Sequence, residues 1–580
     1  MTDNERDSLR SILAELAPQR RSALLPALHA AQQLHGWIDE EVAKEVATAL
    51  SLPLAEVFGV LDFYAMLYRQ PVGRRVLRVC SAPVCALAGA DAITDSLCRH
   101  LQIAPGEISL DGEFTVEHAP CLGLCDRAPA VLAGETAIGS ADAGQPASIC
   151  MSTEEKTPSF VGGDIRVLTN HCGAGRPTSL SEYQKHGGYA GLKKALTMTP
   201  QSVLTEVKSA GLVGRGGAAF PTGIKWEGAA NAPGQPKYIV CNADESEPGT
   251  FKDRILMEED PHRIIEGMVI AAHAVGANRG YIYVRGEYRY AFNVMSAALA
   301  EAREVSMIGA KIFASKLDFD IEMRLGAGAY ICGEETALLE SIEGKRGLPR
   351  IKPPFPMTCG LFGKPTVINN VETFCNIPLI IERGPKEYRK IGTERSPGPK
   401  LFCVSGHIQR PGLYEVAFGI TLRHLLFDLA GGLKQGRKLQ AVLMGGAAGA
   451  FATEKDLDVV LSFETLSAAG LPLGSGAVMV FDDTVDMPDV LKRLTHFFAD
   501  ESCGKCYPCQ LGTRRQYEIL ARGAAGQMLA GDRERLSDVG ATMIDASICG
   551  LGQTASLVVL SAMKLWPELF DVGFTSRGDS

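Results

Sequence analysis

Eight of the sixteen cysteines fall into two spaced sets whose residue type and spacing could bind iron. The first set is a C-x4-C pair and a C-x3-C pair, namely Cys80, Cys85, Cys121 and Cys125. Four thiolates in two pairs suit a 2Fe-2S cluster or a structural zinc ion, and the spacing alone leaves both open. The residues between the ligands are small and apolar, so backbone N–H groups can point at cluster sulfur, which favours iron.

The second set is a C-x2-C-x2-C run followed by a remote fourth cysteine, namely Cys503, Cys506, Cys509 and Cys549. Three closely spaced ligands and a distant fourth are the ferredoxin pattern of 4Fe-4S ligation. Zinc sites usually take two close ligands from each of two segments, so the pattern favours a cluster. The other cysteines are scattered and are expected in the core. They are Cys98, Cys150, Cys172, Cys241, Cys332, Cys359, Cys375 and Cys403.

The densest glycine segment, residues 214 to 226, contains Gly214, Gly216 and Gly217. Glycine allows the backbone to approach a phosphate or a planar ring closely. The segment is only superficially similar to a dinucleotide fingerprint, because that motif follows a strand and residues 202 to 210 are predicted to be helical. An ordinary Rossmann turn is therefore disfavoured, and by itself the loop could be a structural turn.

Polar residues gather in three further segments of the same region. Asp244, Glu245 and Glu247 follow a predicted strand, and they form either a solvated acidic loop or a site for ribityl and ribose hydroxyls. The segments 326 to 336 and 352 to 355, together with Asn369 and Asn370, add the same residue types. Four such segments in one domain favour a nucleotide or flavin site.

The composition restricts the class of protein. A net charge of -9 argues against an extended nucleic-acid surface, which needs an excess of Lys and Arg. The first residues lack the pattern of a signal peptide, and the most apolar windows are far shorter than the roughly 18 residues that span a bilayer. We expect no direct membrane insertion and a cytoplasmic location, where sixteen cysteines are more readily explained by metal ligands than by disulfides.

The elements that must position these residues indicate a multidomain α/β protein. Residues 8 to 60 have apolar residues at helical spacing, residues 75 to 80 form a strand that ends at Cys80, and residues 422 to 430 form a helix. The predicted divisions are a helical plus α/β domain at 1–145, a linker at 146–164, an α/β domain at 165–398, a β-grasp domain at 399–485 and a helical domain at 486–580.

Taken together, these motifs resemble the fused form of two diaphorase subunits found in respiratory complex I, NAD-dependent formate dehydrogenases and NAD-reducing hydrogenases. The resemblance covers essentially the whole chain. It implies that residues 1–145 include a thioredoxin-like 2Fe-2S domain. It also implies an FMN-binding domain, a ubiquitin-like β-grasp (SLBB-like) domain and a C-terminal four-helix-type bundle with the 4Fe-4S cluster.

The resemblance also implies the binding residues. The family's FMN site falls on Gly214, Gly216, Gly217, Lys225, Asn242, Asp244, Tyr330, Gly333, Glu334, Asn369 and Asn370. In its NAD(H) site, Phe220 and Phe355 match aromatic residues that sandwich the adenine, and Glu247 and Lys352 flank the dinucleotide. Glu335 matches an acidic residue near the adenosine ribose, where a carboxylate should repel a 2′-phosphate and favour NAD over NADP.

Two positions need separate mention. Glu245 is our candidate catalytic residue, placed beside the flavin to influence its electronics. The chain departs from the family at Gly228, where many complex I members have a second Phe two residues after the Trp of the glycine loop. Adenine stacking is therefore expected to be weaker or arranged differently.

The implied function is hydride exchange between NAD(H) and FMN, followed by one-electron transfer through the clusters to or from a partner subunit with further iron–sulfur clusters. We take that partner to be the molybdenum or tungsten alpha subunit of a formate dehydrogenase, because the modules are fused and residues 170 to 175 resemble formate dehydrogenase flavin subunits. The alternatives are a NAD-reducing hydrogenase and complex I. An interpretation from another class is a zinc-stapled scaffold, which iron content and colour would separate from the redox proteins.

Overall fold

A computed structural model describes residues 2–152 and 158–572. Four helices open the chain, and their apolar faces pack against one another. They are α1 (Asp3–Leu16), α2 (Leu24–His35), α3 (Glu40–Leu50) and α4 (Leu54–Leu61). Thr2 begins α1 with a capping box, because its hydroxyl accepts from the Glu5 N–H while the Glu5 carboxylate accepts from the Thr2 N–H.

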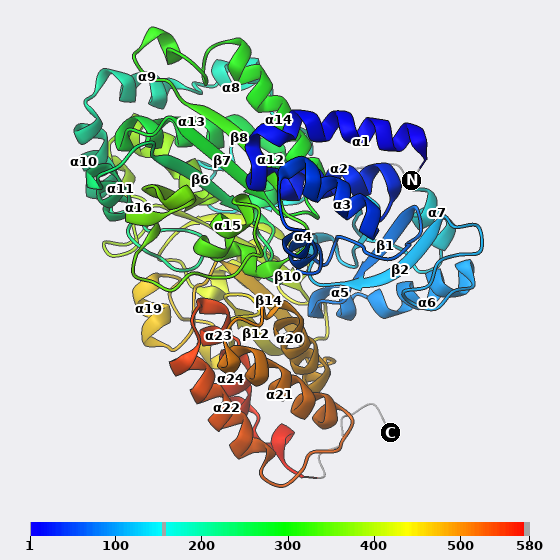
Figure 1. Cartoon of the computed structure of the whole chain (residues 1–580). Helices are drawn as coiled ribbons and strands as arrows, with labels where there is room; N and C mark the ends of the chain where they lie inside the picture. Colours follow the sequence, from blue (N-terminus) through cyan, green and yellow to red (C-terminus); the bar gives the residue numbers. More distant parts are fainter. Residues whose placement is uncertain (1, 153–157, 573–580) are drawn as a thin grey trace.

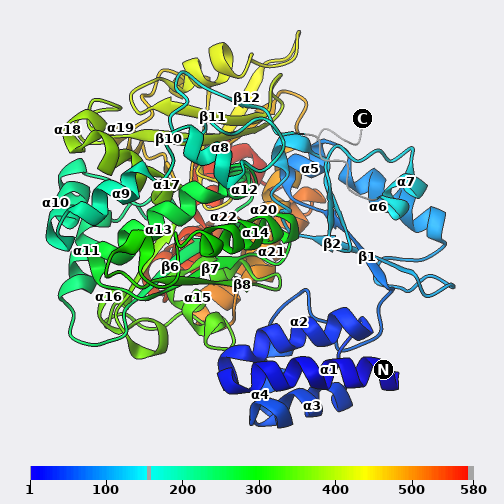
Figure 2. The same ribbon diagram turned by 90° about the horizontal axis from the view of Figure 1, so that it is seen from above.

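The next domain is a four-stranded sheet in the order β2-β1-β3-β4, with β1 parallel to β2 and antiparallel to β3. Its strands are β1 (Arg75–Cys80), β2 (Phe114–Ala119), β3 (Val131–Ala133) and β4 (Thr136–Ile138). Its helices are α5 (Pro83–Leu87), α6 (Ala90–Leu101) and α7 (Pro146–Met151). Figure 2 shows this domain and helices α1 to α4 as two separate lobes beside the larger body of the chain.

The central domain contains a fully parallel sheet in the order β8-β7-β6-β9. The strands are β6 (Tyr238–Ala243), β7 (Arg279–Val284), β8 (Asp320–Leu325) and β9 (Thr366–Asn370). Helices α13 (Pro261–Val275) and α17 (Val371–Arg383) pack on the sheet and are buried along most of their length. Strand order reverses between β6 and β9, and in open parallel sheets ligands bind at such a switch point, outside the carboxyl ends of the strands.

The β-grasp region forms a six-stranded sheet in the order β13-β12-β14-β10-β11-β5. The strands are β5 (Val161–Gly162), β10 (Pro399–Gly406), β11 (Gly412–Ala417), β12 (Leu439–Met444), β13 (Ala450–Ala452) and β14 (Ala477–Asp482). The helix predicted at residues 422 to 430 is a π-helix at His424–Leu429.

The stretch 146–164, predicted to be a linker, contains secondary structure at both ends. Helix α7 packs on β3, and β5 adds to the β-grasp sheet by pairing in parallel with β11. Residues 153–157 of this stretch lie outside the described residues.

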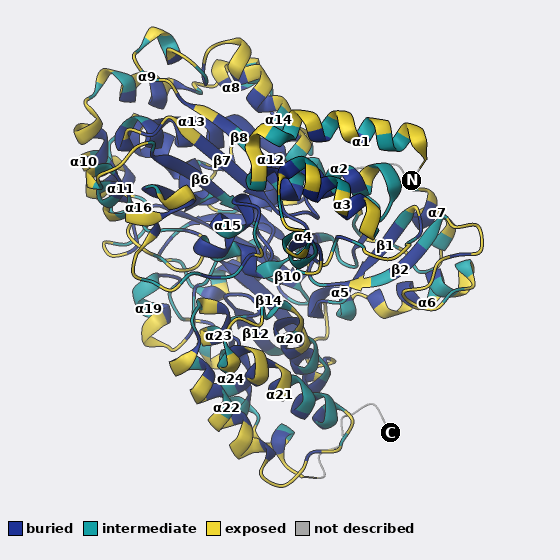
Figure 3. Ribbon diagram, viewed as in Figure 1, coloured by how far each residue is buried: buried dark blue, intermediate teal, exposed yellow. Residues whose placement is uncertain are grey.

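Five helices close the described chain: α20 (Met487–Glu501), α21 (Tyr507–Ala524), α22 (Asp532–Ala546), α23 (Gly550–Thr554) and α24 (Leu557–Leu565). Figure 1 shows them as a bundle projecting below the β-grasp sheet. In Figure 3 the strands of the central domain are almost entirely buried, whereas the bundle and α1 expose their outer faces. Across the described residues, no helix combines the length and the apolar character that a membrane crossing requires.

Candidate functional site

A cavity of about 680 Å³ opens at the carboxyl ends of β6 and β9. Its walls come from three domains: the central domain, the β-grasp loop around residues 470 to 475, and helices α23 and α24 of the bundle. Asn242 and Asn370, which pair across β6 and β9, both line it. The cavity therefore lies at the switch point of the parallel sheet, where the topology favours a ligand site.

Ten of the predicted site residues line this cavity. They are Gly216, Gly217, Asn242, Asp244, Glu245, Glu247, Tyr330, Gly333, Glu334 and Asn370. The glycine loop reaches it between two helices, α10 (Pro200–Ala210) and α11 (Thr222–Asn231), so the helix predicted before the loop is confirmed. A Cβ on Gly216 would lie 3.1 Å from the Cβ of Asn370, and Gly217 has a φ of +124°, so a larger residue would fill this wall or strain the backbone.

Asp244 has the strongest sign of an expected ligand. One carboxylate oxygen accepts from the Ser246 hydroxyl at 2.9 Å, and the other, Oδ2, is buried without a hydrogen-bond partner. Burial raises the pKa of Asp244 to about 7. Because an unsatisfied buried acceptor is costly, this oxygen fits a ligand that brings hydroxyl donors, such as a ribityl chain.

Glu247 links the central domain to the β-grasp domain beside the cavity. Its Oε1 accepts from the Ala448 N–H at 2.8 Å, and its Oε2 accepts from the Tyr330 hydroxyl. Burial raises the pKa of Glu247 to about 7, although these hydrogen bonds oppose the shift. Its carboxylate is therefore positioned from both sides before any ligand enters.

Glu245 lines the cavity, but its carboxylate binds to the protein. Oε1 accepts from the Asp253 N–H and Oε2 from the Arg254 N–H, both at 3.0 Å, so Glu245 satisfies the first turn of α12 (Lys252–Glu259). The Tyr288 hydroxyl also donates to Oε2 at 3.2 Å. Burial, with a contribution from Asp253, raises the pKa of Glu245 to about 7.

Four charged residues form an alternating ion-pair group next to the cavity. Lys225 Nζ lies 3.3 Å from Glu335 Oε2, and Lys352 Nζ lies 2.9 Å from Glu334 and 3.1 Å from Glu335. Glu334 belongs to both this group and the cavity wall. Burial acts to raise the pKa of Glu335, yet the charges of Lys225 and Lys352 outweigh it and the pKa is lowered.

Phe220 and Phe355, the predicted adenine-stacking residues, are 43% and 48% exposed. They do not line the cavity, and the Lys225 ammonium lies over the Phe220 ring at 5.9 Å from its centre. A Cβ on Gly228 would lie only 2.4 Å from the sulfur of Met357, so Met357 occupies the space beside this glycine. The departure at Gly228 is therefore filled by a flexible apolar side chain from another segment.

Two predicted residues have structural contacts instead. The side-chain oxygen of Asn369 accepts from the Trp226 indole at 2.8 Å, which joins β9 to α11. The N–H of Gly214 donates to the carbonyl of Phe220 at 2.9 Å and closes the glycine loop. Neither residue lines the cavity.

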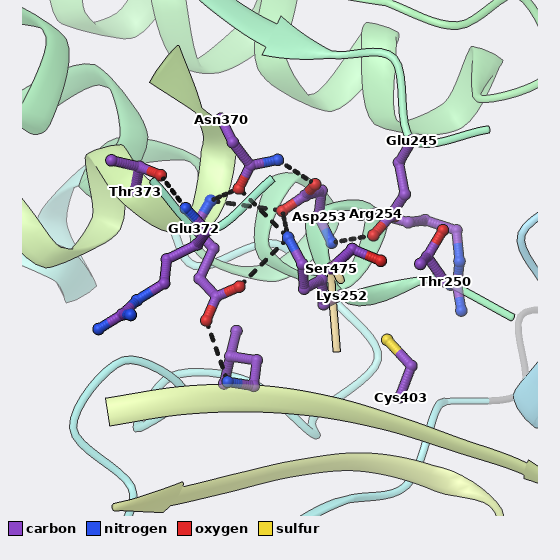
Figure 4. Close-up of polar contacts among 12 residues, drawn as sticks. Glu245, Thr250, Lys252, Asp253, Arg254, Asn370, Glu372, Thr373, Cys403 and Ser475 are labelled. Carbon is purple, nitrogen blue, oxygen red and sulfur yellow. Dashed lines mark hydrogen bonds and ion pairs between the residues drawn. The ribbon is translucent and has the colours of Figure 1, made fainter. Parts of the chain in front are cut away.

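A buried charge group beneath the cavity was missed from the sequence (Figure 4). Lys400 Nζ pairs with Glu372 at 2.7 Å, Glu372 also pairs with Lys252 at 3.2 Å, and Lys252 pairs with Asp253 at 2.7 Å. Asn370 donates to Asp253 at 2.6 Å and so connects the group to the cavity wall. Burial lowers the pKa of Lys400 to about 8 despite the Glu372 carboxylate. Isolated charges inside apolar segments, such as Lys400 in its strand, were the available signal.

The first cysteine set converges at the edge of the thioredoxin-like sheet. Cys80 ends β1, Cys85 lies in α5, and Cys121 and Cys125 follow β2. All four are at most 2% exposed, and the sulfurs of Cys121 and Cys125 lie 3.4 Å apart. The Gly123 N–H donates to the Cys121 sulfur at 3.4 Å. Buried thiolates with a backbone donor fit an iron–sulfur cluster.

The second set lies at the top of the C-terminal bundle. Cys503 follows α20, Cys506 and Cys509 begin α21, and Cys549 precedes α23. Burial raises the pKa of Cys509 to about 12, and the charges of the three other cysteines add to the shift, so the four sulfurs face one another. Within residues 2–152 and 158–572, no three Cys, His, Asp or Glu side chains are arranged around a single metal ion.

Comparison with known proteins agrees with this division. The Nuo51 FMN-binding domain matches residues 207–379, a thioredoxin-like [2Fe-2S] ferredoxin matches 9–153, and the NADH-ubiquinone oxidoreductase-F iron-sulfur binding region matches 489–572. An F-type NADH-quinone oxidoreductase subunit of Rhizobium meliloti is 49% identical over 386 residues, which are 66% of this chain and 92% of that protein. This chain belongs to the NADH-quinone oxidoreductase-F family.

Two hydrogenase proteins extend the comparison of this oxidoreductase-F family member. NADP-reducing hydrogenase subunit HndC of Solidesulfovibrio fructosivorans is 48% identical and covers 70% of this chain and 83% of its own. A crystal structure of an NAD⁺-reducing [NiFe]-hydrogenase in the H₂-reduced state has a TM-score of 0.85 at 34% identity. It covers 97% of this chain and 94% of that chain.

The chain is thus a fused diaphorase subunit, an NAD(H)-dependent oxidoreductase of the oxidoreductase-F or NAD-reducing hydrogenase type. It has an FMN-binding domain and two iron–sulfur regions, for 2Fe-2S and 4Fe-4S clusters. The predicted fold class and cofactor classes are confirmed. The relatives named here give no support to formate dehydrogenase, our first choice of partner from the sequence, or to a zinc-stapled scaffold.

Proposed function

We propose that this chain is the diaphorase subunit of a NAD-reducing hydrogenase-type complex. The observation that carries the proposal is the likeness to the hydrogenase chain over 97% of this chain, including the fused ferredoxin domain. The Rhizobium relative matches only about two thirds of it. We also propose a cytoplasmic location, since all sixteen cysteines are free thiols, as expected in a reducing compartment.

We further propose that the 680 Å³ cavity binds FMN. Gly216 and Gly217 would offer backbone to the cofactor, and the unpaired Oδ2 of Asp244 would accept from a ribityl hydroxyl. Tyr330 and Glu247 would form the wall that excludes water. When bound, FMN supplies hydride chemistry toward nicotinamide and one-electron chemistry toward the clusters. The protein supplies position and electrostatics.

The ion-pair group and the exposed aromatic residues are proposed to bind the adenosine half of the dinucleotide. Phe220 and Phe355 offer exposed rings for stacking, and Met357 adds an apolar surface beside Gly228. Glu335, held ionised between Lys225 and Lys352, would repel a 2′-phosphate and favour NAD over NADP.

Formate dehydrogenase remains the second candidate, and its sequence argument is weakened by the local geometry. The N–H groups of Gly173, Ala174 and Gly175 all donate to the Glu259 carboxylate, at 2.7, 3.0 and 3.1 Å. His171 lies 3.1 Å from Asp260. This segment has the contacts of an anchor onto the end of α12 and does not identify a partner.

The partner can be identified by purifying the tagged chain from its native cells under anaerobic conditions and measuring the metals and activities that co-purify. The proposal predicts nickel in the complex and H₂-driven reduction of NAD⁺. Molybdenum or tungsten with formate-driven reduction of NAD⁺ would replace it with the formate dehydrogenase candidate. A quinone-linked complex that contains neither set of metals would also overturn it.

A further inference from the structure

Three residues of the central domain connect the flavin cavity to the loop that carries two 2Fe-2S ligands, Cys121 and Cys125. Arg254, Arg285 and Tyr288 are at most 4% exposed. Each contacts Glu245 on one side and the cysteine loop on the other. A single residue of the cavity wall is thus joined to the cluster loop by three buried contacts.

Arg285 makes the most direct of these connections. One guanidinium nitrogen, Nη2, donates to the carbonyl of Cys121 at 2.6 Å, and the other, Nη1, donates to the carbonyl of Glu245 at 2.8 Å. Glu287 balances the charge through contacts of 2.7 and 3.1 Å. The cation therefore touches the backbone of a cluster ligand, while its counter-ion binds another edge of the guanidinium.

The other two residues fix the distance between the domains. Arg254 donates from Nε to the carbonyl of Gly123 at 2.9 Å and pairs with Asp126 at 3.1 Å. Gly123 has a φ of +67°, and a Cβ at this position would lie 1.9 Å from the Tyr288 hydroxyl. Only glycine allows the loop to approach the ring so closely.

Charge at this position acts on the cluster. A reduced cluster has one more negative charge than an oxidised one, so a nearby buried cation stabilises the reduced form. The pKa of Cys121 is lowered, chiefly by hydrogen bonds with Cys125 and Cys80 and further by the charge of Arg285. The same charge would thus favour a reduced cluster and a thiolate ligand.

We propose that Arg285 is a positioning residue that raises the reduction potential of the 2Fe-2S cluster and holds the cluster loop against the flavin cavity. The inference uses the cluster assigned to the first cysteine set and does not depend on which partner complex the chain joins. Its failure would therefore leave the hydrogenase proposal untouched.

The test is a redox titration of the full chain, loaded with FMN and iron, in which the EPR signals of the two clusters are followed separately. In Arg285→Gln, the reduced-to-oxidised ratio of the 2Fe-2S cluster at a fixed potential should fall at least about tenfold, equivalent to 59 mV for one electron. The 4Fe-4S signal should titrate as in the wild type. Arg285→Lys, which keeps the charge, should retain most of the potential.

Two variants make the result specific. Arg285→Gln/Glu287→Gln leaves no unpaired buried carboxylate, so its shift should have the same sign and be smaller, and it decides the question if the single variant does not load iron. Arg263→Gln removes a buried arginine that pairs with Asp260 at 2.8 Å and hydrogen-bonds to neither cluster loop, so it should leave the 2Fe-2S potential unchanged.

A second measurement does not need the cofactors. Hydrogen exchange of residues 119–127 in the iron-free protein should become faster in Arg285→Gln and remain nearer the wild type in Arg285→Lys. The proposal is overturned if the 2Fe-2S cluster of Arg285→Gln titrates within twofold of the wild type. It is also overturned if both clusters, or the Arg263→Gln control, shift by the same amount.

Discussion

The two cysteine sets differ in their access to solvent. The 2Fe-2S ligands are enclosed between two domains and are at most 2% exposed. Of the 4Fe-4S ligands, Cys503, Cys506 and Cys549 are partly exposed, and only Cys509 is buried. Beside them Tyr507 and Leu511, one turn apart on α21, are 76% and 64% exposed. The first site can exchange electrons only within the chain, whereas the second faces outward and is suited to a partner subunit.

The largest expected effect comes from deleting one ligand of each set. Cys509→Ser should remove the 4Fe-4S EPR signal and lower partner-linked NAD⁺ reduction about 100-fold or more, because the outward path is lost. Its matched variant, Cys85→Ser, should remove the 2Fe-2S signal and lower the same rate less than tenfold. Equal losses in the two variants would remove the functional difference between the clusters.

The enclosed side can be tested at the flavin. Asp244→Asn should weaken FMN binding about 10- to 100-fold, the loss expected when a charged acceptor no longer receives a hydroxyl donor. Fluorescence titration of the flavin-free protein measures the affinity. Ser246→Ala is the control, because it removes the neighbouring hydroxyl and leaves the Asp244 carboxylate in place. Unchanged affinity in Asp244→Asn would show that Oδ2 does not face the cofactor.

Thiol accessibility tests the comparison without any cofactor. In the iron-free protein, iodoacetamide should modify Cys503, Cys506 and Cys549 at least about tenfold faster than the four cysteines of the first set, because alkylation needs an exposed thiolate. Mass spectrometry of the peptides gives the rates, with exposed Cys359 as the positive control. Similar rates for the two sets would contradict the enclosure of the first.

The dinucleotide rim should behave as an open, charge-selective surface. Glu335→Gln removes the carboxylate that is expected to repel a 2′-phosphate, and kcat/KM with NADPH relative to NADH should rise about tenfold. Ferricyanide reduction measures both rates. Since a 48% identical relative is named as NADP-reducing, the absence of any gain would move the determinant of specificity away from Glu335.

The smallest effect is on stability and depends on pH. The pKa of Glu247 is raised by burial from 4.5 to about 7, so the folded protein keeps this proton while the unfolded chain releases it. Wild-type stability should therefore decrease as pH rises from about 4.5 to 7, and Glu247→Gln should lack this part of the decrease. The variant should gain about 1 to 3 kcal/mol over wild type at pH 8 and little at pH 5, measured by thermal unfolding of the flavin-free protein. An equal difference at both pH values would contradict the assigned cause.

The sequence predicted those parts of the fold that depend on local pattern. The strand ending at Cys80, the helix before the glycine loop and the strand at residues 238 to 241 were all visible as periodicity. Residues 146–164 were harder, because β5 is too short to have a period and is stabilised by pairing with β11, about 250 residues away in sequence.

The same limit applies to the site. Residue type and spacing were enough to choose both cysteine sets, and the family resemblance supplied the ten cavity residues. The Lys400–Glu372 pair and the Arg285 contacts join segments far apart in the sequence, so no local pattern records them. Glu245 was selected for its position beside the cavity, yet both carboxylate oxygens hold the start of α12, which only the folded chain reveals.

The most direct test of the account is an anaerobic titration of the purified, iron-reconstituted chain with NADH, followed by flavin absorbance and EPR. The account predicts bound FMN and the appearance of both cluster signals on addition of NADH, with a much weaker response to NADPH. Colourless protein without FMN, or flavin-loaded protein whose clusters remain oxidised in excess NADH, would contradict it.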